Sequence, residues 1–151
     1  MSDDKWKQDL DAFFEAQEQE DKRKEQEAIA NLNNESKEAA EAATFFHTVA
    51  KAAFEEIATQ LKQHGRMVWV NVTNNSAHIR VEYGDVHELN FTLRARGRIV
   101  YTIERFNQDG KAQSREGFID RAFNDTFSNL TQDKIIRHTL ERYKDNVRRS
   151  R

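Results

Sequence analysis

The chain lacks two residue types altogether. It has no cysteine and no proline, and only 5 glycines occur among its 151 residues. Without cysteine there is no disulfide framework, no thiolate metal site and no catalytic thiol, and without proline long helices need not be interrupted. Apolar runs fall far short of the ~20 residues of a membrane-spanning helix. Residues 1–7 are polar and no secretion-type apolar segment follows them, so we expect a soluble cytoplasmic protein.

Catalytic and metal-binding motifs are also absent from the sequence. The 5 histidines form no H-x-H, i,i+4 or H-E-x-x-H pattern of the kind that a zinc site uses. There is no glycine-rich phosphate loop and no G-x-S-x-G elbow. The segment NQDGK (residues 107–111) lacks the acidic series and the closing glutamate of a calcium loop, so we interpret it as a turn. The sequence therefore predicts a protein that is not an enzyme and holds no metal or cofactor.

Charge is divided unevenly along the chain, although the net charge is only −2. Residues 1–64 hold 8 Lys and Arg against 15 Asp and Glu, a net charge of −7. Residues 65–151 hold 16 against 11, a net charge of +5. This pattern is typical of an acidic arm joined to a mildly basic body.

An apolar stripe lies close to the N-terminus. Residues 3–64 contain neither Gly nor Pro and are rich in strong helix formers, which predicts a long helix. Residues 15–27 contain no large apolar side chain, so the stripe is isolated from any core. It fits a helix that docks in the groove of a protein partner, and it equally fits a helical hairpin that folds back on its own domain. The stripe occupies positions i, i+4, i+7 and i+8: Trp6, Leu10, Phe13 and Phe14.

A second apolar pattern, made mostly of small residues, continues along the same helix. From Ile29 to Ile57 these residues recur at alternating intervals of three and four. Small side chains allow two helices to approach closely. We therefore expect helix pairing, either as a hairpin within the chain or as a homodimer through a coiled coil.

Strand patterns replace helical ones after residues 64–65. Alternating apolar and polar residues, separated by turn residues, predict four antiparallel strands near residues 67–72, 77–83, 89–95 and 99–103. Two segments with helical spacing follow. The first covers residues 118–130, and the second, residues 132–147, has Thr131 as a candidate N-cap.

These patterns together predict the fold class α+β. We expect a long N-terminal helical arm, a four-stranded antiparallel β-meander and two C-terminal helices packed on the sheet. The predicted division is into residues 1–43, an acidic arm for oligomerisation or partner docking, and residues 44–151, an α-β-β-β-β-α-α globular domain.

Side-chain alternation predicts how the strands pair, because a shift of one residue exchanges the two faces of a strand. An even loop in the first hairpin places Trp69 opposite Arg80. An odd loop at residues 84–86 places Ile79 opposite Phe91. An odd loop at residues 96–98 places Leu93 opposite Tyr101 and Phe91 opposite Ile103.

The third hairpin is rich in arginine. Its predicted register places Arg96 and Arg98 at the tip, with Arg94 just behind them on the polar face. Arginines of this kind bind phosphates, but sheets that bind single strands interleave several exposed aromatic residues with the basic ones. The predicted polar face offers only two aromatic residues, and three acidic residues divide its positive charge: Trp69 and Phe106, and Glu82, Glu88 and Glu104.

The C-terminus is basic, with 7 Lys and Arg in residues 134–151. Cations stabilise the C-terminal end of a helix, which explains them without any partner. They also form a candidate docking patch for an acidic partner or phosphate, with Arg142, Arg148 and Arg149 as the leading residues.

We therefore expect a non-enzymatic protein-interaction module (an adaptor, assembly factor or inhibitor), with the N-terminal stripe as its partner-binding residues. The alternative is a nucleic-acid-binding protein that uses the Arg94–Arg98 hairpin tip and the basic C-terminal helix. A third hypothesis, a small-molecule pocket between helix and sheet, has the same sequence signature as an ordinary core; its candidate residues are Phe45, Phe54, Phe91 and Tyr101.

Overall fold

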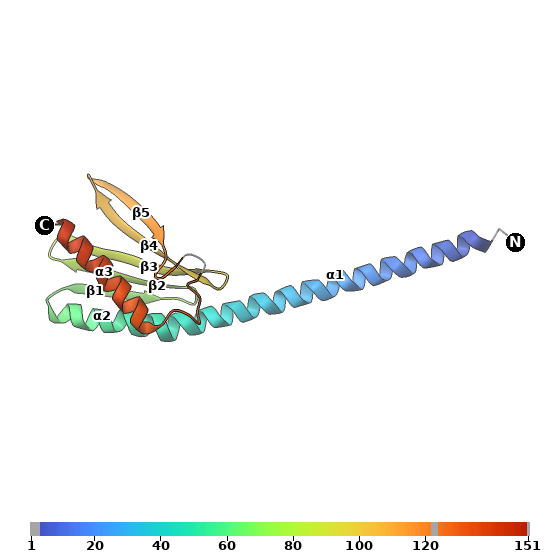
Figure 1. The fold of residues 1–151 in the computed structure, drawn as a ribbon, viewed down its shortest axis with the longest axis horizontal. Helices are drawn as coiled ribbons and strands as arrows, with labels where there is room; N and C mark the ends of the chain where they lie inside the picture. The colour runs from blue at the N-terminus through green and yellow to red at the C-terminus, as the bar shows by residue number, and fades with distance from the viewer. Residues whose placement is uncertain (1–3, 122–123, 151) are drawn as a thin grey trace. The chain divides into compact units, whose positions relative to one another are not determined.

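A computed structural model describes residues 4–121 and 124–150. The contacts between residues divide the chain into two compact units, Met1–Lys37 and Glu38–Arg151. The elements follow in the order shown in Figure 1: α1 (Lys5–Thr44), a π-helical segment η2 (Phe45–Ala50), α2 (Lys51–Gln63), β1 (Met67–Val72), β2 (Ser76–Tyr83), β3 (Val86–Arg96), β4 (Ile99–Gln108), β5 (Lys111–Gly117) and α3 (Gln132–Ser150).

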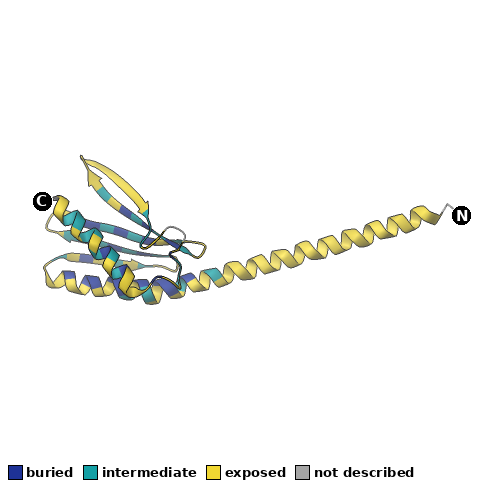
Figure 2. Cartoon of the chain, viewed as in Figure 1, coloured by how far each residue is buried: buried dark blue, intermediate teal, exposed yellow. Residues whose placement is uncertain are grey.

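The first unit consists of the N-terminal part of α1. Every described residue from 4 to 37 is exposed to solvent, as Figure 2 shows. Helix-forming residues and local ion pairs stabilise it: Arg23 contacts Glu20 at 3.0 Å and Glu27 at 3.2 Å, the i,i+3 and i,i+4 spacings at which side chains of a helix meet. The predicted long N-terminal helix is confirmed.

The second unit is built on an antiparallel sheet in the order β1-β2-β3-β4-β5. Helices α2 and α3 pack on the same face of this sheet: Phe54 of α2 and His138 of α3 both lie against Phe91 of β3, with ring centroids 6.3 Å and 5.8 Å away. The core lies between them and contains the fully buried Ile79 and Leu93. The α+β class with an antiparallel sheet is therefore confirmed.

The first two hairpins have the predicted register. Trp69 pairs with Arg80, and Ile79 pairs with Phe91. The second hairpin reaches this pairing by a different route. A two-residue turn, in which Gly84 has φ +60°, closes the hairpin, and a β-bulge between β2 and β3 adds the extra residue, Glu88.

The predicted register of the third hairpin is wrong. Arg96 pairs with Ile99, so the turn has two residues rather than three, and Gly97 takes φ +62° as a primed hairpin turn requires at its first central position. Leu93 consequently lies opposite Thr102 instead of Tyr101, and Phe91 lies opposite Glu104 instead of Ile103. The odd-numbered apolar residues of β4 thus face away from the helices.

The predictions of four strands and two C-terminal helices are also wrong. A fifth strand, β5, pairs with β4 after a turn in which Asp109 and Gly110 both have positive φ, as a type I′ turn requires. Most of its residues are polar and all but Gly117 are exposed, so no apolar alternation marks it. The turn predicted for residues 107–111 is present.

The described residues of this segment, 118–121 and 124–130, do not form the predicted helix, and Ala122 and Phe123, which were also placed on it, lie outside the described residues. The carboxylate of Asp125, which is 1% exposed, accepts hydrogen bonds from the backbone N–H groups of Ile119 (2.6 Å), Asp120 (3.0 Å) and Arg121 (3.2 Å). These bonds hold the segment as a loop, because they occupy donors in a non-helical arrangement. The predicted N-cap is confirmed, since Thr131 Oγ1 accepts from the N–H of Lys134 at 3.2 Å.

Candidate functional site

The N-terminal apolar cluster, which we define as Trp6, Leu10, Phe13 and Phe14, is exposed. The exposed fractions of the four residues are 58%, 46%, 59% and 60% in that order. The rings of Phe13 and Phe14 contact each other edge to face, with centroids 5.5 Å apart. Within one helix, the cluster is a preformed apolar surface of large side chains.

The small-residue pattern divides into two parts with different surroundings. Its first large residues, Ile29 and Leu32, are 55% and 63% exposed. Its later members Phe46, Ala53 and Ile57 are buried in the core of the second unit, where they pack near the sheet. Exposure along the pattern therefore extends to Ala39, and pairing with a second copy stays a prediction.

The three arginines of the third hairpin lie in different surroundings. Arg98, in the turn, forms a two-pronged ion pair with Glu41, with Nε and Nη2 at 3.0 Å and 3.4 Å from its oxygens. Arg96 stacks its guanidinium over the ring of Tyr101, 5.1 Å from the centroid. Arg94 pairs with Tyr101 across the strands and forms no ion pair within the described residues.

Glu88 was predicted on the polar face, and this is wrong. It is 4% exposed and lies on the helix-covered side because it is the bulge residue of β3. Its carboxylate accepts hydrogen bonds from Arg66 Nε at 3.1 Å and from the Tyr143 hydroxyl at 2.7 Å. Burial, together with this hydrogen bond, raises the pKa of Tyr143 to about 12, so the hydroxyl remains a donor.

Glu104 was also predicted on the polar face and is also buried, at 4% exposed. Arg142 Nε and Asn146 Nδ2 of α3 each donate to it at 2.9 Å, and Arg115 of β5 lies 3.6 Å away. Arg142, a candidate contact for an acidic partner, is thus engaged inside the protein, where it fastens α3 to β4.

The outer sheet face is the side turned away from α2 and α3. We define it by the residues of β1 to β4 that alternate with the core: Met67, Trp69, Asn71, Ser76, His78, Arg80, Glu82, His87, Asn90, Thr92, Arg94, Arg96, Ile99, Tyr101, Ile103 and Arg105. Sequence analysis missed Tyr101 because it placed this residue in the core. Phe106, in contrast, alternates to the helix side, where Arg115 lies 5.3 Å from its ring centroid.

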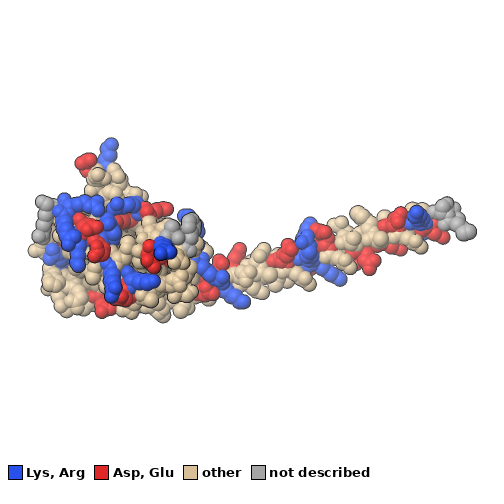
Figure 3. All heavy atoms as spheres, viewed as in Figure 1, with Lys and Arg blue, Asp and Glu red and all other residues tan. Residues whose placement is uncertain are grey.

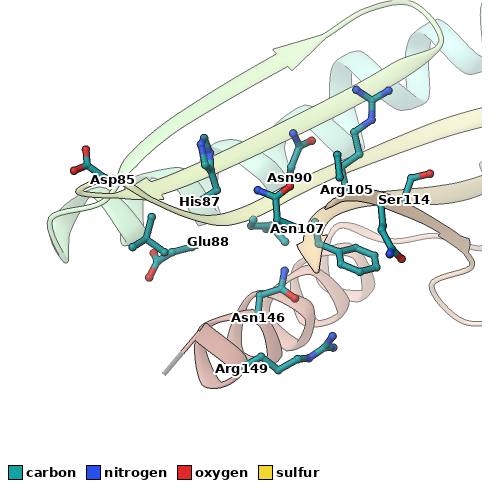
Figure 4. A pocket seen from close by; sticks show the side chains of 14 residues that line it. Asp85, His87, Glu88, Asn90, Arg105, Asn107, Ser114, Asn146 and Arg149 are labelled. Carbon is teal, nitrogen blue, oxygen red and sulfur yellow. The ribbon is translucent and has the colours of Figure 1, made fainter. Parts of the chain in front are cut away.

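A cleft of about 980 Å³ opens where β3 and β4 separate, beyond the last pair, Phe91 with Glu104. Figure 4 shows Arg105, Asn90 and His87 on one side of the sheet and Arg149 with Asn146 on the side of α3. Arg149, a predicted contact residue, therefore borders a real cleft.

The basic C-terminal helix carries few free charges. Arg148 lies 3.7 Å from Asp145, which also pairs with Arg142, and Arg137 lies 3.0 Å from Asp133. Figure 3 shows acidic side chains interspersed with basic ones over the face that α3 covers. The helix is thus a mixed-charge surface.

The predicted small-molecule pocket does not form as proposed. Phe45, Phe54 and Phe91 are buried in the core, at 3%, 0% and 1% exposed, but Tyr101 lies on the opposite face of the sheet. Within the described residues, no group of three or more acidic or histidine side chains is arranged to hold a metal ion. Across the same residues, no helix combines the length and apolarity needed to cross a bilayer.

Comparison with protein-family models, with curated proteins and with solved structures gave no match for this chain.

Proposed function

We propose that this protein is an interaction module, of the adaptor, assembly-factor or inhibitor type, whose N-terminal apolar cluster binds a groove of a protein partner. The observation that carries the proposal is the exposure of four large apolar side chains on one continuous helix. Burying one such side chain contributes about 1.5–3 kcal/mol. Four on a preformed helix are enough to anchor a helix in a groove.

The surroundings of the cluster support a role outside its own unit. The residues that follow it are charged and polar, and Arg23 among them forms ion pairs along the helix with Glu20 and Glu27. A helix of this kind presents its cluster to a partner without a further folding step, which lowers the entropic cost of binding.

The test is quantitative capture with full-length protein variants. The triple substitution Trp6→Ala, Phe13→Ala and Phe14→Ala removes the cluster and keeps helix propensity, since Ala is the strongest helix former. The matched control is Gln17→Ala with Gln19→Ala and Gln26→Ala, three exposed residues of the same helix that lie outside both apolar patterns. We expect the wild type and the control to capture the same cross-linked partner in equal amounts. The triple variant should not capture it.

A partner set identical for all three proteins would contradict the proposal. A second copy of this chain as the captured partner would identify the groove as one formed by self-association. Sedimentation of wild type and the triple variant distinguishes that case, because only the wild type would then be dimeric.

A further inference from the structure

The outer sheet face is an uncovered surface in the second unit. Both helices of that unit pack on the other face, against Phe91. Trp69 on the outer face is 39% exposed, and residues of β2 to β4 on the same face are only partly buried. A sheet with one free face is the platform on which several kinds of protein bind extended ligands.

Two arginine–aromatic stacks stand on this face. The guanidinium of Arg80 lies 4.2 Å from the ring centroid of Trp69, and that of Arg96 lies 5.1 Å from the ring centroid of Tyr101. The first stack joins β1 to β2, and the second joins β3 to β4. The two planar stacks are therefore separated by the width of the central strands, with His78 and Thr92 between them.

The charge of the outer face is more positive than the sequence indicated. Two of the three carboxylates expected there, Glu88 and Glu104, are buried on the other side in contacts with Arg66 and Arg142. Glu82 remains on the outer face, and the exposed Glu116 of β5, which pairs with Ile103, adds a second carboxylate to it.

The basic groups of this face are largely unneutralised. The nearest carboxylate to Arg80 is Glu82 at 3.8 Å, and Glu82 is itself 3.0 Å from His87. Within the described residues, no carboxylate lies within ion-pair distance of the three other arginines of the face: Arg94, Arg96 and Arg105.

From this arrangement we infer that the outer sheet face binds single-stranded nucleic acid, with bases stacked on Trp69 and Tyr101 and phosphates held by Arg94, Arg96 and Arg105. Unpaired arginines supply the phosphate contacts. The exposed ring of Trp69 and the partly buried ring of Tyr101 supply stacking surfaces. Stacking on them needs bases that are not already stacked in a duplex. Arginines beside aromatic rings favour a single-stranded nucleic acid, in which a planar base accompanies each charged phosphate. An acidic protein has no planar group repeated beside each charge.

The experiment uses the full-length chain and fluorescence anisotropy. The probes are labelled oligothymidylate and oligouridylate of about 16 nucleotides, the upper site size of a single OB fold that binds single strands. We expect binding at low salt, and we expect the logarithm of the binding constant to fall linearly with the logarithm of the salt concentration. Replacing Arg94 or Arg96 by Ala should reduce the salt slope by about 1 for each phosphate that the arginine neutralises in the wild type.

The aromatic residues are tested separately from charge. Trp69→Ala and Tyr101→Ala should each weaken binding by about 5- to 100-fold with an unchanged salt slope, as expected for the loss of base stacking. Trp69→Phe and Tyr101→Phe keep an aromatic ring and should retain most of the affinity. These conservative variants also show whether a loss in the Ala variants comes from binding or from impaired folding.

The control is Arg137→Ala with Arg148→Ala, which removes two exposed arginines of α3 away from the outer face. Equal weakening by this control and by the Arg94 and Arg96 variants would overturn the inference, since binding would then follow net charge alone. Three further results would also overturn it: no binding at about 50 mM salt, tighter binding of duplex of the same length, and complete competition by polyglutamate, which would assign the face to an acidic protein.

Discussion

At the scale of single residues, two buried carboxylates hold α3 on the sheet. Glu88 of β3 accepts a hydrogen bond from Tyr143, and Glu104 of β4 accepts one from Arg142. Both hydrogen bonds therefore join a strand to the same helix, α3. A buried acid with its partners in place is tolerated, but removal of one member leaves the other without a partner in a poorly solvated place.

The Glu88→Ala substitution should therefore destabilise the protein. We expect the free energy of unfolding in urea to fall by about 3 kcal/mol, because the Tyr143 hydroxyl and Arg66 lose their buried acceptor. The matched control is Glu82→Ala on the neighbouring strand, whose contacts with the exposed side chains of Arg80 and His87 are each worth less than about 1 kcal/mol. Equal effects of the two substitutions would contradict this role of Glu88.

His138 gives the protein a specific pH dependence. Burial lowers its pKa below the usual value, and the positive charge of Arg142 lowers it further, whereas Glu104, Asp125 and Glu141 oppose these effects to a smaller extent. The unfolded state therefore binds a proton at a higher pH than the folded state does. The stability contributed by neutral His138 is complete above the unfolded pKa of about 6.5 and is lost as the pH falls from there through the lower folded pKa.

The measurement is the free energy of unfolding of wild type and His138→Gln between pH 8 and pH 5. We expect the wild type to lose more stability than the variant over this interval. Parallel curves would show that His138 does not contribute to the acid dependence.

At the scale of elements, the sequence predicts well where periodicity is strong and the partners are local. The long α1, the first two strand pairings and the Thr131 N-cap follow from helix formers, alternation and a capping hydroxyl. The third hairpin was mispredicted because Ile99, Tyr101 and Ile103 have the alternation of a core face. The observed register depends on Gly97, which forms the turn, and on the buried partners of Glu104. Those partners belong to α3, which is distant in the sequence.

The loop after β5 was mispredicted for a related reason. Its apolar residues have helical spacing, and Phe127 does reach the core, 5.3 Å from the ring of Phe45. The conformation is determined instead by one side chain, Asp125, which gathers backbone donors from three residues. Neither this carboxylate's burial nor the exposed strand β5 before the loop leaves a periodic signal in the sequence.

Asp125→Ala should therefore loosen this loop. We expect a loss of about 2–4 kcal/mol in the free energy of unfolding, since buried N–H groups lose a charged acceptor, and faster amide exchange at residues 119–121. Asp120→Ala is the control, because the carboxylate of Asp120 is exposed and lies in an ion pair with Lys134 at 3.4 Å. An unchanged exchange pattern in Asp125→Ala would contradict the role assigned to this residue.

At the scale of the whole molecule, the two proposed binding surfaces belong to different units of the chain. The N-terminal apolar cluster lies in the first unit, and the outer sheet face lies in the second. The core of the second unit is formed by its own residues, beginning with Ala42. On this account the cluster serves a partner and contributes nothing to the folding of residues 38–151.

The most direct test of this central claim is the thermal unfolding of the full chain beside a chain that lacks residues 1–26. The account predicts that the Tm of the second unit is the same in both, within about 2 °C. A Tm lowered by more than about 4 °C, which corresponds to roughly 1 kcal/mol for a unit of this size, would contradict it, because the cluster would then stabilise its own domain.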